Sequence, residues 1–167
     1  NNSVNKKNNY ITLDRGSKHG IITGMGVICD QGVVGVIVDV SENFSTVLSV
    51  LSIKTKITPK IEGNEYFGSF EWDGFTPDMA KLTQVNMHAP IKNGMKVVTS
   101  GFSPIYPENI NIGTIEEFSR EADDNFYDIK IKLSTNFSSL TKVYVVKNLY
   151  KEEIDSLERI TSGTTDN

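Results

Sequence analysis

Residues 97–113 read Val-Val-Thr-Ser-Gly-Phe-Ser-Pro-Ile-Tyr-Pro-Glu-Asn-Ile-Asn-Ile-Gly. The β-branched start favours a strand, and Gly101 interrupts it. Pro104 and Pro107 then restrict the backbone of a loop, and a second strand begins close to Gly113. The stretch therefore predicts two strands joined by a proline-containing loop, and the rest of the chain is interpreted around it.

A shorter version of the same pattern occurs about seventy residues earlier. Residues 21–28 read IITGMGVI and residues 91–98 read IKNGMKVV. A glycine follows each segment at Gly32 or Gly101, and a strand then opens at Gly35 or Gly113. Three positions separate the first glycine pair and twelve the second, which predicts a nine-residue insertion. We interpret the repeat as two small β units of similar plan.

Short alternating segments dominate the remaining sequence. Tyr127, Ile129, Ile131 and Leu133 alternate with polar residues, and residues 53–58 alternate in the same way, so both predict half-buried strands. Ten or eleven such segments at hairpin spacing indicate an all-β protein of the sandwich or barrel class. We predict two small packed β-barrels, with structural turns at Gly24, Gly35, Gly101, Pro107 and Gly113.

The predicted division of the chain follows from these patterns. Residues 1–9 form a polar linker from a removed segment, residues 10–62 the first barrel unit, and residues 63–148 the second, with terminal strands that can cross between barrels. Tyr150, Ile154 and Leu157 predict an amphipathic helix over residues 149–160. Residues 161–167 are expected to be disordered.

Composition excludes several classes of function. The net charge is −4, so no basic footprint for nucleic acid is present. No apolar run reaches the ~18 residues of a membrane span. With one cysteine and two histidines, the sequence predicts no metal site. It also contains no phosphate-binding glycine loop, so we predict no cofactor.

Ser100 beside Gly101 raises the alternative of a trypsin-like serine hydrolase. Such an enzyme needs an imidazole base within hydrogen-bond reach of the serine. The candidates are His19 and His88, and neither has the sequence surroundings of a protease histidine. The segment also lacks a nucleophile elbow. A turn serine is the simpler interpretation, and we predict no catalytic residue.

Aromatic residues in predicted loops are the remaining candidates. Phe75, Phe102 and Tyr106, together with the neighbouring Ile105, are expected to contact a protein partner, because exposed aromatic side chains can anchor interfaces. The same aromatic residues are equally compatible with a place in the core. A third alternative is a carbohydrate-binding β module, which requires Trp72 to be exposed as a platform.

Taken together, the ordered motifs resemble a known family. Residues 9–21 (NYITLDRGSKHGI), 24–28 (GMGVI), 32–37 (GVVGVI), 97–102 (VVTSGF), 106–107 (YP) and 112–115 (IGTI) are similar to motifs of the MreC rod shape-determining proteins. The similarity covers residues 3–149. Asn109 departs from the glycine usual in the family, and the segment Gly94-Met95-Lys96 stands in place of the commoner Gly-Asp.

The resemblance implies a periplasmic or extracytoplasmic pair of β-barrels, related to trypsin-like folds but without a triad. It implies an N-terminal membrane helix and coiled coil preceding this sequence. It also implies a non-enzymatic scaffold of cell-wall elongation that self-associates into dimers or filaments. The implied partners are a class B penicillin-binding protein, MreD, MreB and RodZ.

Overall fold

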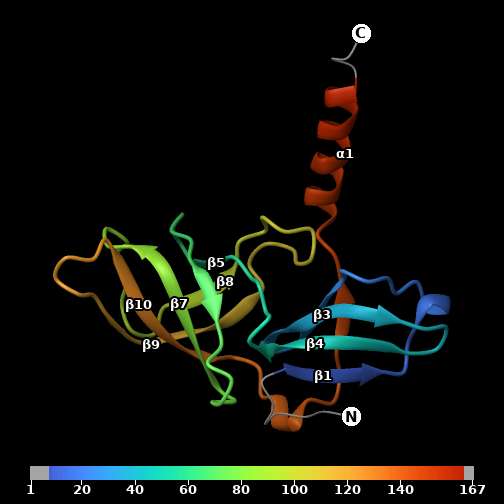
Figure 1. Ribbon diagram of the computed structural model, residues 1–167, viewed down its shortest axis with the longest axis horizontal. Helices are drawn as coiled ribbons and strands as arrows, with labels where there is room; N and C mark the ends of the chain where they lie inside the picture. The colour runs from blue at the N-terminus through green and yellow to red at the C-terminus, as the bar shows by residue number, and fades with distance from the viewer. Residues whose placement is uncertain (1–7, 164–167) are drawn as a thin grey trace.

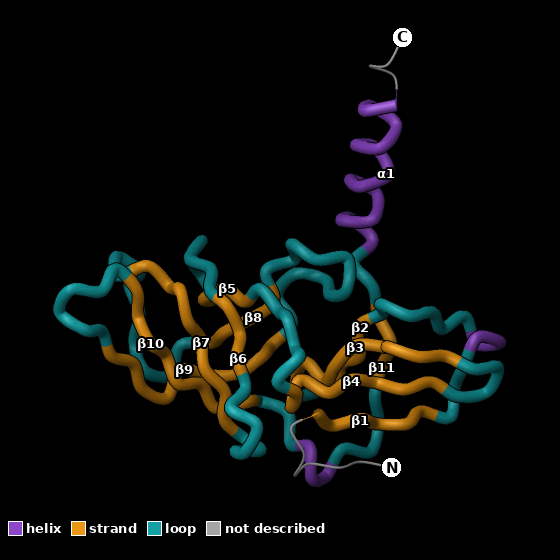
Figure 2. The backbone as a smooth tube through the Cα atoms, in the orientation of Figure 1, coloured by secondary structure: helices purple, strands orange, loops and turns teal. Residues whose placement is uncertain are grey.

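The computed structural model describes residues 8–163, whose strands form two packed units (Figures 1 and 2). In chain order the elements are β1 (Asn8–Leu13), η1 (Ser17–His19), β2 (Gly26–Cys29), β3 (Gly32–Val40), β4 (Ser45–Ser52), β5 (Pro59–Ile61), β6 (Ser69–Glu71), β7 (Met79–Asn86), β8 (Lys96–Thr99), β9 (Asn111–Ser119), β10 (Phe126–Leu133), η2 (Phe137–Ser139), β11 (Tyr144–Val146) and α1 (Leu149–Gly163).

Each unit is built on one antiparallel sheet. The first sheet has the order β1-β4-β3-β2-β11, and the second has the order β5-β8-β9-β10-β7-β6. The second sheet nearly closes, because Lys60 of β5 bridges to Phe67 and the Gly68 N–H donates to Pro59 O at 3.0 Å. The prediction of an all-β chain with two packed barrel units and a C-terminal helix is confirmed.

The sequence repeat is also a repeat of geometry. Gly24 and Gly94 both have a φ of +89°, in the left-handed region that glycine adopts readily. The Gly24 N–H donates to Ile37 O at 2.8 Å, and the Gly94 N–H donates to Ile115 O at 2.7 Å. The same turn therefore leads into the same strand pair in both units.

The extra residues of the second unit lie between β8 and β9. Gly35 and Gly113 do not form the predicted turns; they lie within β3 and β9, where each allows close approach of a neighbouring strand. Gly35 pairs with Val27, and Gly113 pairs with Val97, so the two glycines occupy matching places. Gly35 follows Gly24 by eleven positions and Gly113 follows Gly94 by nineteen, which makes the insertion eight residues long. The predicted insertion of nine residues was one residue too long, because Gly101 is not the structural counterpart of Gly32.

The first unit is discontinuous in sequence, because the second unit is inserted between its strands β4 and β11. After β4 the chain leaves the first sheet, and β5 pairs with β8 of the second. After β10 it returns, and β11 pairs with β2 of the first. β5 thus lies within residues 10–62 but belongs to the second sheet, whereas β11 lies within residues 63–148 but belongs to the first.

Three local expectations differ from the structure. Residues 53–58 form no strand; the Thr55 N–H closes a turn onto Ser52 O at 3.2 Å, and Ile53 is exposed. Asn8 and Asn9 of the predicted linker belong to β1, and the buried Asn9 amide donates to Leu51 O at 2.6 Å. Helix α1 continues to Gly163, so residues 161–163 of the expected disordered tail are helical. Residues 1–7 and 164–167 lie outside the described residues.

Helix α1 extends away from both sheets (Figure 1). None of its residues is buried. Within residues 8–163, no helix combines the length and apolar content that a bilayer crossing requires.

Candidate functional site

The loop at residues 100–110 is fixed at its base by Thr99. The Thr99 hydroxyl donates to Pro107 O at 2.7 Å and accepts the Ile110 N–H at 2.9 Å. The Asn109 N–H donates to Thr99 O at 3.0 Å. One buried threonine therefore holds both ends of the eight-residue insertion together.

Asn109 adopts a backbone conformation typical of the glycine that the family resemblance leads us to expect at this position. Its φ is +70°, in the left-handed region that asparagine tolerates better than most residues. Asn109 therefore supports a glycine-like turn at this position. Gly101, at the other end of the loop, has a φ of +78°.

Tyr106 lies between the two units rather than on the surface. Its side chain is buried, and its hydroxyl donates to Gly35 O in the first sheet. The ring lies so close to Gly26 of β2 that a Cβ there would be 2.7 Å from it. Burial raises the pKa of the Tyr106 phenol well above its usual value, so the hydroxyl stays protonated. A buried side chain cannot meet a partner directly, and Tyr106 joins the two units.

Phe102 is the exposed aromatic residue of this loop. Its side chain is 54% exposed, and its ring packs on the half-buried Phe67 with centroids 4.4 Å apart. Ile105 is half-buried and lines a small cavity with Tyr106 and Lys56. Phe102 therefore supplies the apolar surface that this loop presents to solvent.

Phe75 is presented by a different ordered turn, between β6 and β7. Its side chain is 75% exposed. The Asp73 carboxylate accepts the Phe75 N–H at 2.7 Å, the Thr76 N–H at 2.9 Å and the Thr76 hydroxyl at 2.9 Å. These bonds, that from the Thr76 N–H above all, lower the pKa of Asp73.

The structure does not bring Phe75 and Phe102 together. In Figure 1 the turn between β6 and β7 lies at the bottom of the six-stranded unit, and the loop between β8 and β9 lies at its top. Beside the Phe75 turn is a groove of about 540 Å³ lined by Asp73, Phe118 and Lys130, among others. The predicted residues thus form two separate exposed aromatic sites and one internal joint.

Ser100 has no histidine beside it in the described part of the chain. Its Oγ accepts the Phe102 N–H at 3.3 Å, as in a turn. His19 lies in the first unit, where its Nδ1 accepts the Gly16 N–H at 3.0 Å. His88 lies in an exposed turn after β7. Among residues 8–163, no hydrogen bond joins Ser100 to an imidazole.

Trp72 does not form a platform for a sugar. It is only 5% exposed, and its indole N–H donates to Thr76 O at 2.7 Å. The observation that the carbohydrate-binding alternative required is therefore missing.

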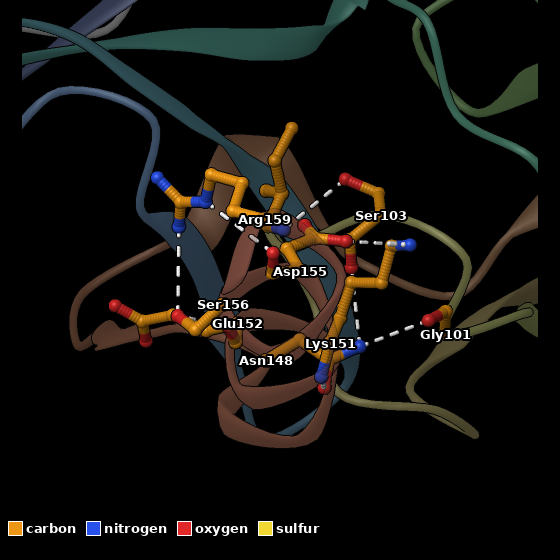
Figure 3. A network of polar contacts seen from close by, with 9 residues as sticks. Gly101, Ser103, Asn148, Lys151, Glu152, Asp155, Ser156 and Arg159 are labelled. Carbon is orange, nitrogen blue, oxygen red and sulfur yellow. Dashed lines mark hydrogen bonds and ion pairs between the residues drawn. The ribbon is translucent and has the colours of Figure 1, made fainter. Parts of the chain in front are cut away.

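The sequence interpretation missed Asn148, which connects the loop to α1 (Figure 3). Its buried amide donates to Gly101 O at 2.9 Å and to Ser103 O at 3.1 Å. Its Oδ1 accepts the Lys151 N–H at 3.1 Å, which caps the helix. An asparagine directly before an amphipathic pattern is an N-cap signal, so this role could have been predicted.

Comparison with known proteins agrees with this architecture. The family described as "Rod shape-determining protein MreC, barrel core" matches residues 1–147. The cell shape-determining protein MreC of Listeria monocytogenes is 27% identical over 161 residues, which are 95% of this chain and 55% of that protein. The chain thus spans about half the length of this relative.

Two solved structures share the fold. One is described as the major periplasmic domain from the cell shape-determining filament MreC; it has a TM-score of 0.74 and 25% identity, over 89% of this chain and 91% of that one. The other is a complex between penicillin-binding protein PBP2 and MreC from Helicobacter pylori, with a TM-score of 0.62 and 15% identity, over 74% of this chain and 77% of that one. Since the family match covers most of the sequence, this chain belongs to the MreC family of rod shape-determining proteins.

Proposed function

We propose that this chain is a non-enzymatic scaffold of the bacterial cell-wall elongation complex. In this proposal it maintains cell shape by associating with itself and by binding a class B penicillin-binding protein, in an assembly that includes MreD, MreB and RodZ. It works on the periplasmic face of the inner membrane, to which an N-terminal anchor holds it.

The observation that carries the proposal is the rigid presentation of Phe102. Thr99 fixes the loop, Phe67 supports the ring, and half of the side chain still faces solvent. Aromatic side chains held in this way bind partners with little loss of conformational entropy. The H. pylori complex supports the kind of partner, because a chain of the same fold meets a penicillin-binding protein there.

Within residues 8–163, the serine of the hydrolase alternative, Ser100, has no hydrogen-bonded base. A serine hydroxyl needs an imidazole within about 3.2 Å to be deprotonated during attack. Ser100 instead accepts a backbone N–H within its own turn. A scaffold requires neither group, so the proposed function accounts for this arrangement.

Cell shape tests the proposal against the hydrolase. In the source bacterium, the gene for the full-length protein is replaced by one that encodes the Ser100→Ala, Phe102→Ala or Phe44→Ala variant. Phe44 is the matched control, because it is 52% exposed on a turn of the other unit. We expect rods with Ser100→Ala and Phe44→Ala and rounded cells with Phe102→Ala, at equal protein levels. Rounded cells with Ser100→Ala would favour catalysis instead.

A further inference from the structure

Helix α1 carries an apolar stripe outside both units. Tyr150, Ile154 and Leu157 are four and three residues apart, so they lie on one face of the helix. Their side chains are 81%, 48% and 58% exposed, and the helix extends away from the sheets (Figure 1). At about 1.5 Å per residue its 15 residues reach roughly 22 Å.

The base of this helix is firmly built. Asn148 caps it and fastens it to the loop at residues 100–110 (Figure 3). Lys147 pairs with Glu152 at 3.3 Å and Lys151 with Asp155 at 2.9 Å along the first turns. A helix this short is marginal in water by itself, so its apolar stripe needs a partner surface to contribute stability.

The charge of the helix favours a protein over a membrane as its partner surface. Between residues 149 and 163 the helix carries four acidic residues and two basic ones. Amphipathic helices that bind anionic lipid carry an excess of lysine and arginine on their polar face. The helix is therefore better suited to a protein than to a membrane surface.

The residues beside the stripe fit a second copy of the same helix in one orientation. If two α1 helices pack antiparallel with Ile154 against Leu157 of the second copy, Lys151 lies beside Glu158 of that copy, and the pair occurs twice by symmetry. In a parallel pair Glu153 would instead lie beside Glu158 of the second copy, which is repulsive.

We propose that α1 is a self-association site at which two copies of this chain pair their helices antiparallel through Tyr150, Ile154 and Leu157. The inference rests on the self-association in the proposed function and names the surface responsible. Two short helices bury less area than a standard interface, so the pairing is weak and depends on concentration. Anchoring in one membrane would raise the effective concentration of the copies.

Sedimentation equilibrium of the 167-residue chain tests the stripe. Leu157→Asp places a charge in it, whereas Ser156→Asp places the same charge one residue away, outside the stripe. We expect Leu157→Asp to raise the dimer Kd at least about tenfold and Ser156→Asp to leave it within about twofold. A monomeric wild-type chain, or equal effects of the two substitutions, would overturn the proposal.

Charge exchange tests the orientation. In the antiparallel pair, Glu158→Lys places a positive charge beside Lys151 of the second copy, so it should raise the dimer Kd about tenfold. The double variant Lys151→Glu with Glu158→Lys should restore the original Kd. In a parallel pair Glu158→Lys alone would strengthen association, and that result contradicts the antiparallel geometry. Binding of the same variants to the penicillin-binding protein is measured as well. If that binding persists and Leu157→Asp leaves self-association unchanged, this inference fails and the proposed function does not.

Discussion

Tyr106 shows how one side chain of the inserted loop fixes the two units to each other. Its ring fills the space that glycine leaves at Gly26, and its hydroxyl reaches Gly35 O. The sequence marked Tyr106 as an aromatic residue in a loop, which is equally compatible with a partner contact and with a buried joint. Only the three-dimensional approach of β2 and β3 distinguishes these roles.

Removing the Tyr106 hydroxyl should have a moderate cost. Tyr106→Phe loses one buried hydrogen bond, so we expect a loss of about 1 kcal/mol in the free energy of unfolding. Tyr106→Ala also leaves a cavity between the units and should lose about 3 kcal/mol or more. Urea titration of the chain measures both. Equal stability of Tyr106→Ala and wild type would contradict the internal role.

Asp73 should make the stability of the chain depend on pH. Its pKa in the folded state is lowered by the N–H groups of Thr76 and Phe75, so the unfolded chain takes up the proton first as pH falls. The stabilisation is therefore present above the unfolded pKa of about 4 and is lost as pH falls through the folded value. Asp73→Asn should reduce the difference in unfolding free energy between neutral pH and about pH 3. An unchanged difference would mean that the turn contributes no linkage.

At the level of single elements, the sequence correctly predicts that the glycine pattern repeats, but it wrongly predicts a strand over residues 53–58. The glycine pattern encodes backbone conformations that few other residues adopt, and both copies realise it. Residues 53–58 alternate as a half-buried strand does, but they connect β4 of one sheet to β5 of the other. Alternation describes the faces of a segment and does not say whether a neighbouring strand is there to pair with it.

The matching glycines should respond to substitution in matching pairs. Gly24→Ala and Gly94→Ala meet no atom within 4 Å but require a left-handed residue, so each should cost about 1–2 kcal/mol. Gly35→Ala and Gly113→Ala would bring Cβ to 2.2 Å or 2.3 Å from a carbonyl oxygen of the neighbouring strand. Their cost should exceed about 2 kcal/mol. Thermal unfolding of the four variants checks whether the effects pair as the repeat requires.

For the whole molecule, the return of β11 makes the first sheet depend on a segment that follows the whole of the second unit. The repeat predicted two units, but no local pattern states which sheet a three-residue strand completes. β5 and β11 pair with β8 and β2, which lie far from them in sequence. The assignment of these strands therefore depends on pairing between segments that are distant in sequence, which no local pattern encodes.

The buried contact of Tyr106 and the return of β11 to the first sheet predict that the two units unfold together. Loss of either unit would expose the Tyr106 side chain and separate its hydroxyl from Gly35 O, so we expect one cooperative transition in urea, with coincident fluorescence and circular dichroism midpoints. Trp72 reports on the second unit, and Tyr144→Trp would place a reporter on β11 in the first sheet. Two separated transitions would show that the units are independent despite the Tyr106 contact.

The proposed scaffold function is tested most directly by binding. The periplasmic part of the class B penicillin-binding protein from the same bacterium is titrated with the 167-residue chain in a calorimeter, using wild type, Phe102→Ala and the control Phe44→Ala. The account predicts saturable binding by wild type, a Kd about tenfold higher for Phe102→Ala, and an unchanged Kd for Phe44→Ala. No binding by the folded wild-type chain, or equal losses in the two variants, would contradict it.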